Sequence, residues 1–423
     1  MNIDPLCLCL IVASASLRTF AAEIRVPEDS STIQEGIDAA ADGDVVRVSA
    51  GVYRENITFR GKDISVESRD GPEVTTILGD GTNAVVRFET REPLTATLSG
   101  FTIRGGHGVP VISAGGGVFV FFGASATIRN TVIVENRACN GGGIAVYGGP
   151  VLLESNFIAN NEPPYPLCKA SLGGGIYLAR GSKKSEVLGN VIYGNISSMG
   201  GGVFVFGTAI IRDNLISDNV SSMGGGINLT ELLGEIYANG VSIIENVIVR
   251  NRATWFGGGV ALSVAPRIFV NNTIADNDIS WSNSGGSAMG IGSLVTHTET
   301  FMANNTFASN SLAPTLWVDQ PSSPPTFFTN NNSWNALGPP YGGNWPDQTG
   351  ELGNNSADPL FIDSGAGDYH LQDGSPCIDN GRNDVPGLAE YDFEGNPRIV
   401  DGSGIGSAII DLGAYEFQPI KNR

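Results

Sequence analysis

The feature that most constrains the fold is a glycine triplet that recurs through the middle of the chain. Each triplet is followed by a short motif close to Asn-x-Ile-x-x-Asn, for example NLISDN at 214–219. The triplets are spaced by 24 to 33 residues and begin at Gly115, Gly141, Gly173, Gly200, Gly224 and Gly257. A unit repeated at such intervals is typical of a solenoid, in which each unit packs mainly on its neighbours.

A single unit, residues 200–223, reads as three short strands separated by a glycine turn, an asparagine turn and a loop. β-Branched residues and asparagines occupy positions where helical repeats need good helix formers. The sequence therefore predicts an all-β fold: a right-handed parallel β-helix, a solenoid with three parallel sheets and about 9–11 coils.

Stacking the units in register places equivalent residues in columns. The third strand of each unit is expected to contribute one inward residue to a core column: Ile133, Ile158, Ile192, Ile216, Ile248, Ile274 and Phe307. One asparagine column is Asn156, Asn190, Asn214, Asn246, Asn272 and Asn305, and the other is Asn136, Asn161, Asn195, Asn219, Asn251, Asn277 and Asn310. Stacked amides can hydrogen-bond from coil to coil, so these asparagines are expected to be structural.

The composition changes along the chain and suggests five segments. A solenoid needs capped ends, and residues 31–40 predict a plug helix with Ser30 or Ser31 as its N-cap and Ile33 and Ile37 on one face. The predicted segments are 1–21, a signal peptide; 22–97, the N-terminal cap and first coils; 98–310, the repeats; 311–355, irregular coil and loops rich in Pro, Asn and Gly; and 356–423, a C-terminal cap of strands and turns.

Charge and hydropathy limit the classes of partner that the chain can have. The formal net charge is −19, which argues against nucleic acid and against anionic membranes, since both need clustered Lys and Arg. The apolar core of the predicted signal, Leu6–Ala15, is too short to cross a bilayer, and no later stretch of 18 apolar residues follows. We expect a monomer exported to the cell surface or the medium.

Three cysteines remain after removal of the predicted signal. Cys139 and Cys168 each precede a glycine triplet on consecutive repeats, so stacking would bring them within disulfide distance. The alternative is that both are free thiols. Because the number of remaining cysteines is odd, they cannot all form disulfides with one another, and this pairing leaves Cys377 over.

Both ends of the chain resemble a known group. The segment IRVPEDSSTIQEGIDAAADGDVVRVSAGVYRENITF and the tail DPLFIDSGAGDYHLQDGSPCIDNG resemble secreted bacterial β-helix proteins of the pectin-lyase-like superfamily. The GGG[IV] and IxxN repeats are also similar to those of chlamydial polymorphic outer-membrane adhesins. The first resemblance implies this fold and export. Its enzymes include pectate lyases, pectin methylesterases, polygalacturonases and uronan epimerases.

The motifs that would carry such chemistry are incomplete. GVYRE at 51–55 resembles the first motif of pectin methylesterases, and Gly106-His107-Gly108 matches a polygalacturonase tripeptide, but the accompanying acidic motifs are missing. The stretch 401–413 resembles a Ca²⁺ loop that retains only Asp401 and Asp411; a structural turn is the other interpretation. No cofactor is expected, with Ca²⁺ as the possible exception.

The first strand of each unit gives the best lead to function. Alternation along the strand directs one set of side chains outward: Phe119, Phe121, Tyr147, Tyr177, Phe204, Phe206, Asn228 and Thr230. This aromatic stripe binds a glycan, or is covered by a loop such as 160–172, or forms a protein interface. Arg180 is the single charge at the end of this face. We therefore predict a secreted protein that binds a polysaccharide or surface partner without evident catalytic machinery; the alternative is a lyase or epimerase acting on a uronate glycan.

Overall fold

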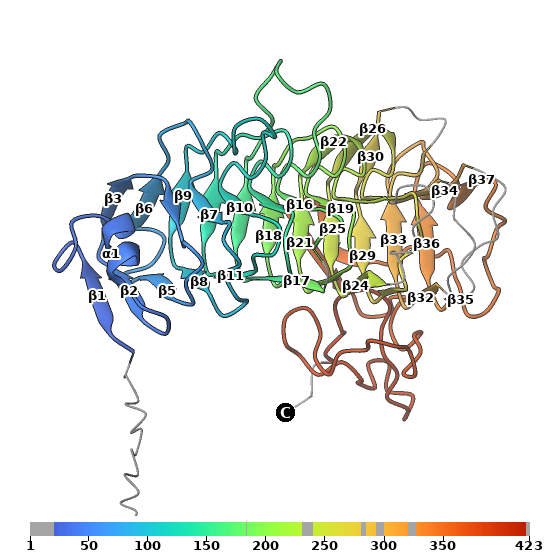
Figure 1. Ribbon diagram of the computed structural model, residues 1–423. Coiled ribbons are helices and arrows are strands. Elements are labelled where there is room, and N and C mark those ends of the chain that lie inside the picture. The colour runs from blue at the N-terminus through green and yellow to red at the C-terminus, as the bar shows by residue number, and fades with distance from the viewer. Residues whose placement is uncertain are drawn as a thin grey trace, which may run out of the picture.

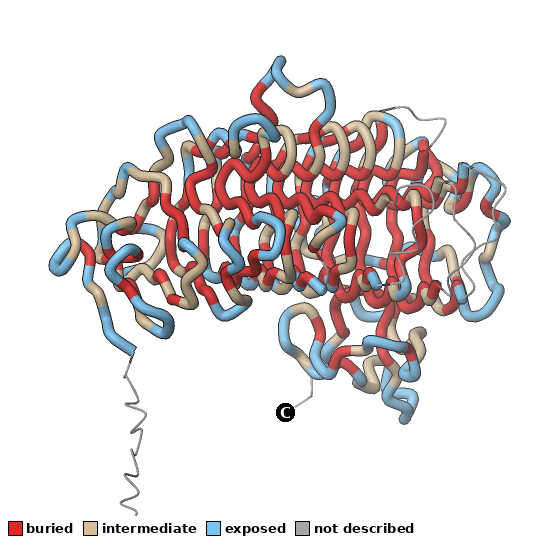
Figure 2. The backbone as a smooth tube through the Cα atoms, in the orientation of Figure 1, coloured by how far each residue is buried: buried red, intermediate tan, exposed pale blue. Residues whose placement is uncertain are grey.

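The computed structural model describes residues 21–182, 184–230, 240–280, 285–292, 300–319 and 327–419. The predicted signal peptide lies outside these residues, apart from Ala21. The chain winds into an elongated solenoid of stacked coils (Figure 1), and its core is a continuous buried band along the axis (Figure 2). Three long parallel sheets, called A, B and C here, form its walls, as predicted.

The strands of each sheet come from successive coils. Sheet A is β1 (Glu23–Val26), β2 (Val45–Val48), β5 (Ser65–Ser68), β8 (Thr97–Ser99), β11 (Ala126–Arg129), β14 (Val151–Glu154), β17 (Ser185–Leu188), β20 (Ala209–Arg212), β24 (Ser242–Ile244), β28 (Ile268–Val270), β32 (Phe301–Ala303) and β35 (Phe327–Thr329). Sheet B is β3 (Gly51–Arg54), β6 (Thr75–Leu78), β9 (Thr102–Arg104), β12 (Val132–Val134), β15 (Phe157–Ala159), β18 (Val191–Tyr193), β21 (Leu215–Ser217), β25 (Val247–Val249), β29 (Thr273–Ala275), β33 (Thr306–Ser309) and β36 (Asn332–Asn335). Sheet C is β4 (Ile57–Thr58), β7 (Val86–Phe88), β10 (Val118–Val120), β13 (Ile144–Val146), β16 (Ile176–Leu178), β19 (Val203–Val205), β23 (Ile227–Leu229), β27 (Val260–Leu262), β31 (Met289–Ile291), β34 (Leu316–Val318) and β37 (Tyr341–Gly343). A short fourth sheet, D, is β22 (Val220–Met223), β26 (Arg252–Phe256) and β30 (Asp278–Ile279).

The core column predicted for the third strands is present on sheet B. Ile133 pairs in register with Ile158, and the pairing continues coil by coil through Ile274 to Phe307. All seven side chains are fully buried. In-register stacking places each apolar side chain on its equivalent in the next coil, so no coil can slip without exposing its inward face.

The two asparagine columns are hydrogen-bonded ladders. Each amide oxygen accepts the backbone N–H and the Nδ2–H of the equivalent asparagine one coil earlier, as Asn219 Oδ1 does from Asn195 at 2.9 and 3.0 Å. The first ladder runs further than predicted, through Asn331 and Asn354. The second ends at Asn277. Asn310 is exposed, because β33 continues to Ser309 where the preceding coil turns at Asp276 (φ 53°).

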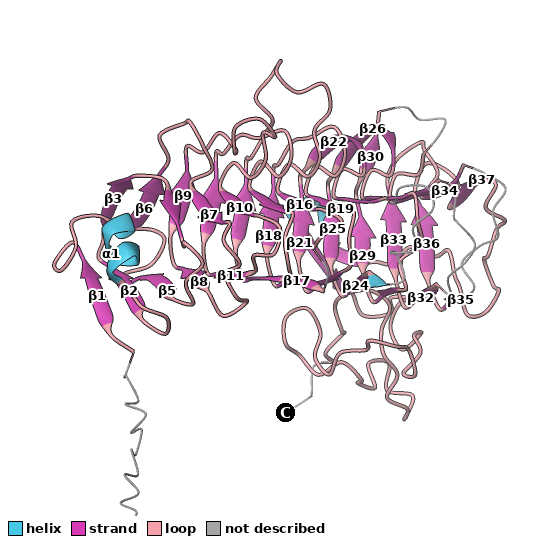
Figure 3. Cartoon of the chain, viewed as in Figure 1, coloured by secondary structure: helices cyan, strands magenta, loops and turns pink. Residues whose placement is uncertain are grey.

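The N-terminal end is closed by helix α1 (Ile33–Ala39) (Figure 3). Ile33 and Ile37 are fully buried against the first coil, as predicted. The N-cap is Thr32, which accepts from the backbone N–H of Glu35, and not Ser30 or Ser31. Ser31 instead donates its hydroxyl to the Glu35 carboxylate at 2.5 Å, and this contact adds to the hydrogen bonding at the start of the helix.

The coils continue through residues 311–355, where the sequence predicted irregular loops. β34, β35, β36 and β37 all lie in this segment and extend the three sheets. The glycine triplet is lost here, so the repeat is hidden although the strands remain. The buried Trp345 ring contacts Phe328 and Tyr341 at centroid distances of 5.2 and 6.3 Å, and we assign the closure of the last coils to this cluster.

The C-terminal segment, residues 356–419, packs along the side of the solenoid (Figure 1). The sequence had predicted that it would cap the end. It holds the hairpin of β38 (Phe361–Asp363) and β39 (Asp368–Leu371) with a 3-10 turn, η2 (Ser364–Ala366), between them. Its Tyr369 and Tyr415 cover Val247, Val249 and Ala275 on the outer face of sheet B, in a cluster with further apolar residues. The side chain of Asn304 bonds both the N–H and the C=O of Arg382, at 2.8 and 3.0 Å.

Cys139 and Cys168 are joined by a disulfide between neighbouring coils. The bond lies next to the residues that pair before the glycine triplets, Asn140 and Leu172. It fixes the base of the long loop that separates these coils, which stands out from the solenoid in Figure 1. Cys377 is a buried free thiol of the C-terminal segment.

Reduction of the disulfide is expected to destabilise the protein. The two cysteines are 29 residues apart, and removing a cross-link of that loop length costs about 3.6 kcal/mol in the chain-entropy account. Urea unfolding with and without a reductant measures the change. The Cys139→Ala, Cys168→Ala double variant should show the lower stability in both conditions; a further shift of this variant by the reductant would contradict the assignment.

Interruption of a ladder is expected to cost more than loss of an exposed asparagine. Asn219→Ala leaves the two donors of Asn195 without their acceptor, at roughly 1–3 kcal/mol for each buried unpaired group. The Oδ1 of Asn251 loses the Nδ2–H donor and keeps the backbone N–H of residue 219. Asn310→Ala is the matched control and should change the free energy of unfolding by less than about 0.5 kcal/mol. Equal effects of the two substitutions in chemical denaturation would show that the ladder contributes little.

Candidate functional site

The aromatic stripe follows sheet C as predicted, but its middle is not accessible. Phe119, Tyr177, Phe204 and Asn228 are in register on neighbouring coils and are 2, 8, 2 and 1% exposed. The prediction that these four side chains form an open binding face is therefore wrong. The exposed or half-buried members are Phe121, Tyr147, Phe206 and Thr230, which lie one step further along each strand.

The glycine triplets themselves cover the stripe. The first glycine of each triplet has a positive φ near 60°, and this conformation folds the chain back over the outer face of the following strand. A Cβ on Gly115 would stand 2.8 Å from the Cβ of Phe119, so only glycine allows this approach. Ala114, Leu172 and Met199, which precede the triplets, pack on the same rings. The alternative prediction, that a loop such as 160–172 covers the stripe, is thus partly correct: successive coils cover it with the residues at their glycine triplets.

Where the strands of sheet C end, the cover stops and a hollow of about 390 Å³ opens. This aromatic pocket is lined by Phe122, Tyr147, Tyr177, Ala179, Arg180, Gly181 and Phe206. Phe122 is 61% exposed. Ring centroids step across the coils from Phe122 to Tyr147 at 6.1 Å and on to Tyr177 at 5.3 Å. With Phe206 on the following coil, the pocket presents ring faces and edges from four successive coils.

The polar groups of the aromatic pocket are few. The Tyr147 hydroxyl accepts a hydrogen bond from Asn140 Nδ2 at 3.1 Å. Burial raises the pKa of both Tyr147 and Tyr177 above the usual value, so both phenols stay protonated and can donate. The exposed Arg180 supplies a positive charge. Apolar walls with a few oriented polar groups are the usual make-up of a ligand pocket.

The strongest electrostatic feature is buried under the C-terminal segment. Arg398 donates to the carbonyl oxygens of Gly413 and Ala414. Its Nε lies 3.3 Å from Glu245 of the solenoid, and both side chains are almost fully buried. Burial raises the pKa of Glu245 to about 8, against the opposing charge of Arg398. This pair joins the segment to the coils.

Two further carboxyls surround this pair. Burial raises the pKa of Asp411 to about 7 and that of Glu416 to about 9; the charge of Asp411 raises the pKa of Glu416 further, and Asp379 does the same to Asp411. Asp411 accepts the backbone N–H groups of Asp379 and Phe417, at 2.7 and 2.6 Å. The cluster contains three buried acids and one buried guanidinium, that of Arg398. Because all four side chains are buried, the cluster is a structural junction and not an exposed reactive site.

The Ca²⁺-loop candidates are separate. Asp401 accepts from the backbone N–H of Ile405 and Gly406 at 2.9 Å each, as in a structural turn, whereas Asp411 is buried in the cluster just described. Across the described ranges, no group of three or more His, Cys, Asp or Glu side chains is arranged to hold a metal ion. These residues do not fit a Ca²⁺ site that would serve lyase chemistry.

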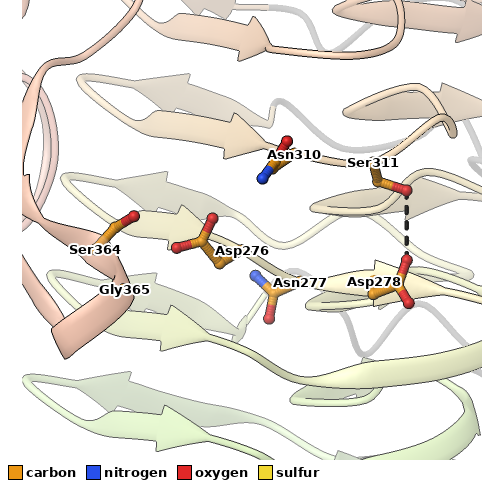
Figure 4. A pocket seen from close by; sticks show the side chains of 7 residues that line it. All are labelled: Asp276, Asn277, Asp278, Asn310, Ser311, Ser364 and Gly365. Carbon is orange, nitrogen blue, oxygen red and sulfur yellow. Dashed lines mark hydrogen bonds between the residues drawn. The ribbon is translucent and has the colours of Figure 1, made fainter.

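A second hollow, of about 340 Å³, lies between sheet B and the C-terminal segment. This polar hollow is lined by Asp276, Asn277, Asp278, Asn310, Ser311, Ser364 and Gly365 (Figure 4). The Tyr369 hydroxyl donates to Asp276 at 3.1 Å, and the Ser311 hydroxyl donates to Asp278 at 3.3 Å. No sequence pattern indicated this site, because η2 reaches it from a distant part of the chain.

Sequence reasoning also missed Phe122. Strict alternation after the outward Phe121 directs Phe122 inward, but the strand has ended at Val120 and the turn exposes both rings. The Phe-Phe-Gly run at 121–123 is the signal that could have shown the turn.

Residues 85–263 match the family model described as the right handed beta helix region. Together with the sheets, the match defines the class: a right-handed parallel β-helix protein. No curated protein matches the chain in sequence.

Solved structures share low identity with the chain. Pectate lyase Pel9A aligns at 15% identity and a TM-score of 0.46, over 95% of this chain and 97% of that one. The Dettilon tailspike protein aligns at 13% and 0.43, over 75% and 68%, and the A-module of Azotobacter vinelandii mannuronan C-5 epimerase AlgE6 at 14% and 0.40, over 77% and 94%. At these values the likeness says nothing of substrate or activity. Within the described residues, no helix has the length and hydropathy to span a membrane.

The buried acids predict that attachment of the C-terminal segment weakens as the pH rises. The docked pKa values of about 8 for Glu245 and about 9 for Glu416 are raised, so their contribution is fully present below the unfolded value of about 4.3 and is lost as the pH rises through 8 to 9. Amide hydrogen exchange of residues 376–416 at pH 5, 7 and 9, corrected for intrinsic rates, measures this.

The matched variant is Glu245→Gln with Glu416→Gln, which removes these two titrations and should reduce the pH dependence to the part contributed by Asp411. Protection that stays constant in the wild-type chain from pH 5 to pH 9 would contradict the prediction.

Proposed function

We propose that the chain binds a glycan through the aromatic pocket and acts outside the cell. The observation that carries the proposal is the cluster of accessible rings from three coils, Phe122, Tyr147 and Phe206, around a hollow with a neighbouring arginine. The C–H face of a sugar ring packs on an aromatic face, whose surface carries partial negative charge. The ring centroids of successive coils lie 6.1 and 5.3 Å apart, so an extended saccharide can contact more than one ring.

The pocket favours binding over catalysis. Among the described residues that line it, Arg180 is the charged side chain and no carboxyl group is present. Glycosidases need paired carboxyls, and a lyase needs a cation or an equivalent charge on the uronate together with a base. The lyase or epimerase alternative therefore rests on Arg180 alone. The partner we propose is a polysaccharide or a saccharide-bearing component of a cell surface.

Loss of the accessible rings is expected to weaken glycan binding. Phe122→Ala with Phe206→Ala removes two rings, each worth about 0.5–1.5 kcal/mol in aromatic contacts, so affinity should fall about tenfold or more. Isothermal titration against neutral and uronate oligosaccharides chosen by a glycan array measures this, and absorbance of the unsaturated product in the same samples detects lyase activity.

Tyr193→Ala removes a ring that is 41% exposed on sheet B, away from the pocket, and is the matched control. The control should bind as the wild type does. Equal binding by all three proteins would exclude the aromatic pocket as the site, and formation of unsaturated product would favour the lyase.

A further inference from the structure

The second amide ladder ends at the polar hollow with two donors unused. In every earlier coil, the backbone N–H and the Nδ2–H of the ladder asparagine both donate to the next amide oxygen, as those of Asn251 do to Asn277 at 2.8 and 3.0 Å. Asn277 itself is 2% exposed. Its Nδ2 keeps one bond, to the carbonyl of Ile248 at 2.8 Å. Among the described residues, no acceptor meets its backbone N–H or its second Nδ2 hydrogen.

These donors are directed at the hollow. In Figure 4 the amide nitrogen of Asn277 points to the space between Asp276 and Asn310, while its oxygen points the other way, to the preceding coil. An oxygen atom at the missing ladder position would accept two N–H groups, as each Oδ1 of the ladder does. The fold thus leaves a preformed place for one acceptor oxygen.

The surrounding groups define what kind of oxygen fits. Asp276 has one carboxylate oxygen bonded by the Tyr369 hydroxyl and another that can accept, and Asp278 lies beside Ser311. Asp278 also lies 3.7 Å from Arg252, so the carboxylate of Asp276 is the main group that disfavours an anion, and the N–H donors of Asn277 disfavour a cation. A hydroxyl group satisfies both sets, because it accepts from N–H and donates to a carboxylate.

We propose that the polar hollow is a binding site for a neutral sugar, in which one hydroxyl completes the ladder at Asn277 and a neighbouring hydroxyl donates to Asp276. The volume of about 340 Å³ lies within the range of small-molecule sites. The site is formed by coils and by the C-terminal segment together, through Ser364 and Gly365. It is separate from the aromatic pocket, and the proposal does not rest on the function proposed for that pocket.

The test is titration of the full chain with maltotriose, cellotriose and mannotriose, with trigalacturonate as the acidic comparison. At least one neutral trisaccharide should bind more tightly than trigalacturonate. Ser364→Trp, which fills the hollow from the C-terminal segment, should abolish this binding. Asp276→Asn should weaken it about tenfold; asparagine tolerates the positive φ at this position and keeps an acceptor for Tyr369.

The matched control is Glu135→Gln. Glu135 occupies the equivalent turn five coils earlier, with φ 56°, and lies 3.7 Å from Arg104, away from the hollow. This control and the Phe122→Ala, Phe206→Ala variant should both retain neutral-sugar binding at the hollow. Neutral-sugar binding that survives Ser364→Trp, preference for trigalacturonate, or a crystal soaked in trisaccharide with only water at Asn277 would overturn the proposal. Retention in the aromatic variant with loss in Ser364→Trp separates this site from the first.

Discussion

Hydrogen bonding from coil to coil is the interaction on which the rest of the structure depends. Each strand is bonded to the strands above and below it, and the asparagine ladders repeat the same pattern at the corners with side chains. An unpaired backbone N–H that is buried at a corner destabilises the fold as much as one inside a globular core, so the turns need an internal acceptor. Asparagine supplies an acceptor and donors together, which is why one residue type recurs from coil to coil between Asn136 and Asn354.

The aromatic pocket and the polar hollow both lie where the repeated pattern ends. Sheet C is covered by its glycine triplets until the strands end, and there the rings of the aromatic pocket become accessible. The second ladder runs until Asn277, and there its donors face the polar hollow. The C-terminal segment turns a symmetric solenoid into one with a covered side, and the buried contact between Arg398 and Glu245 lies at its junction with the coils. Both proposed sites therefore lie where a regular scaffold is interrupted.

Much of the fold follows from the sequence because the repeats constrain it many times over. The Ile133-to-Phe307 column and the ladder from Asn136 to Asn277 each rest on a spacing that one register alone satisfies. The site was harder to predict. Alternation correctly directs Phe204 outward, but its burial depends on where the backbone of Gly200 folds back, which no residue pattern states.

Contacts between distant segments were the least predictable. Nothing near Arg398 indicates Glu245 as its partner, and nothing near Ser364 indicates the end of a ladder. The continuation of the coils through β34 to β37 was hidden for a different reason: the glycine triplets that marked the repeat are lost, although the strands still pair.

The most direct test of the central claim is a crystal structure of the full chain with an oligosaccharide that it binds. The account predicts an ordered sugar ring packed against Phe206 and Tyr147 in the aromatic pocket, with Arg180 near its polar edge. An aromatic pocket that holds only water while the saccharide is ordered on another face would contradict it.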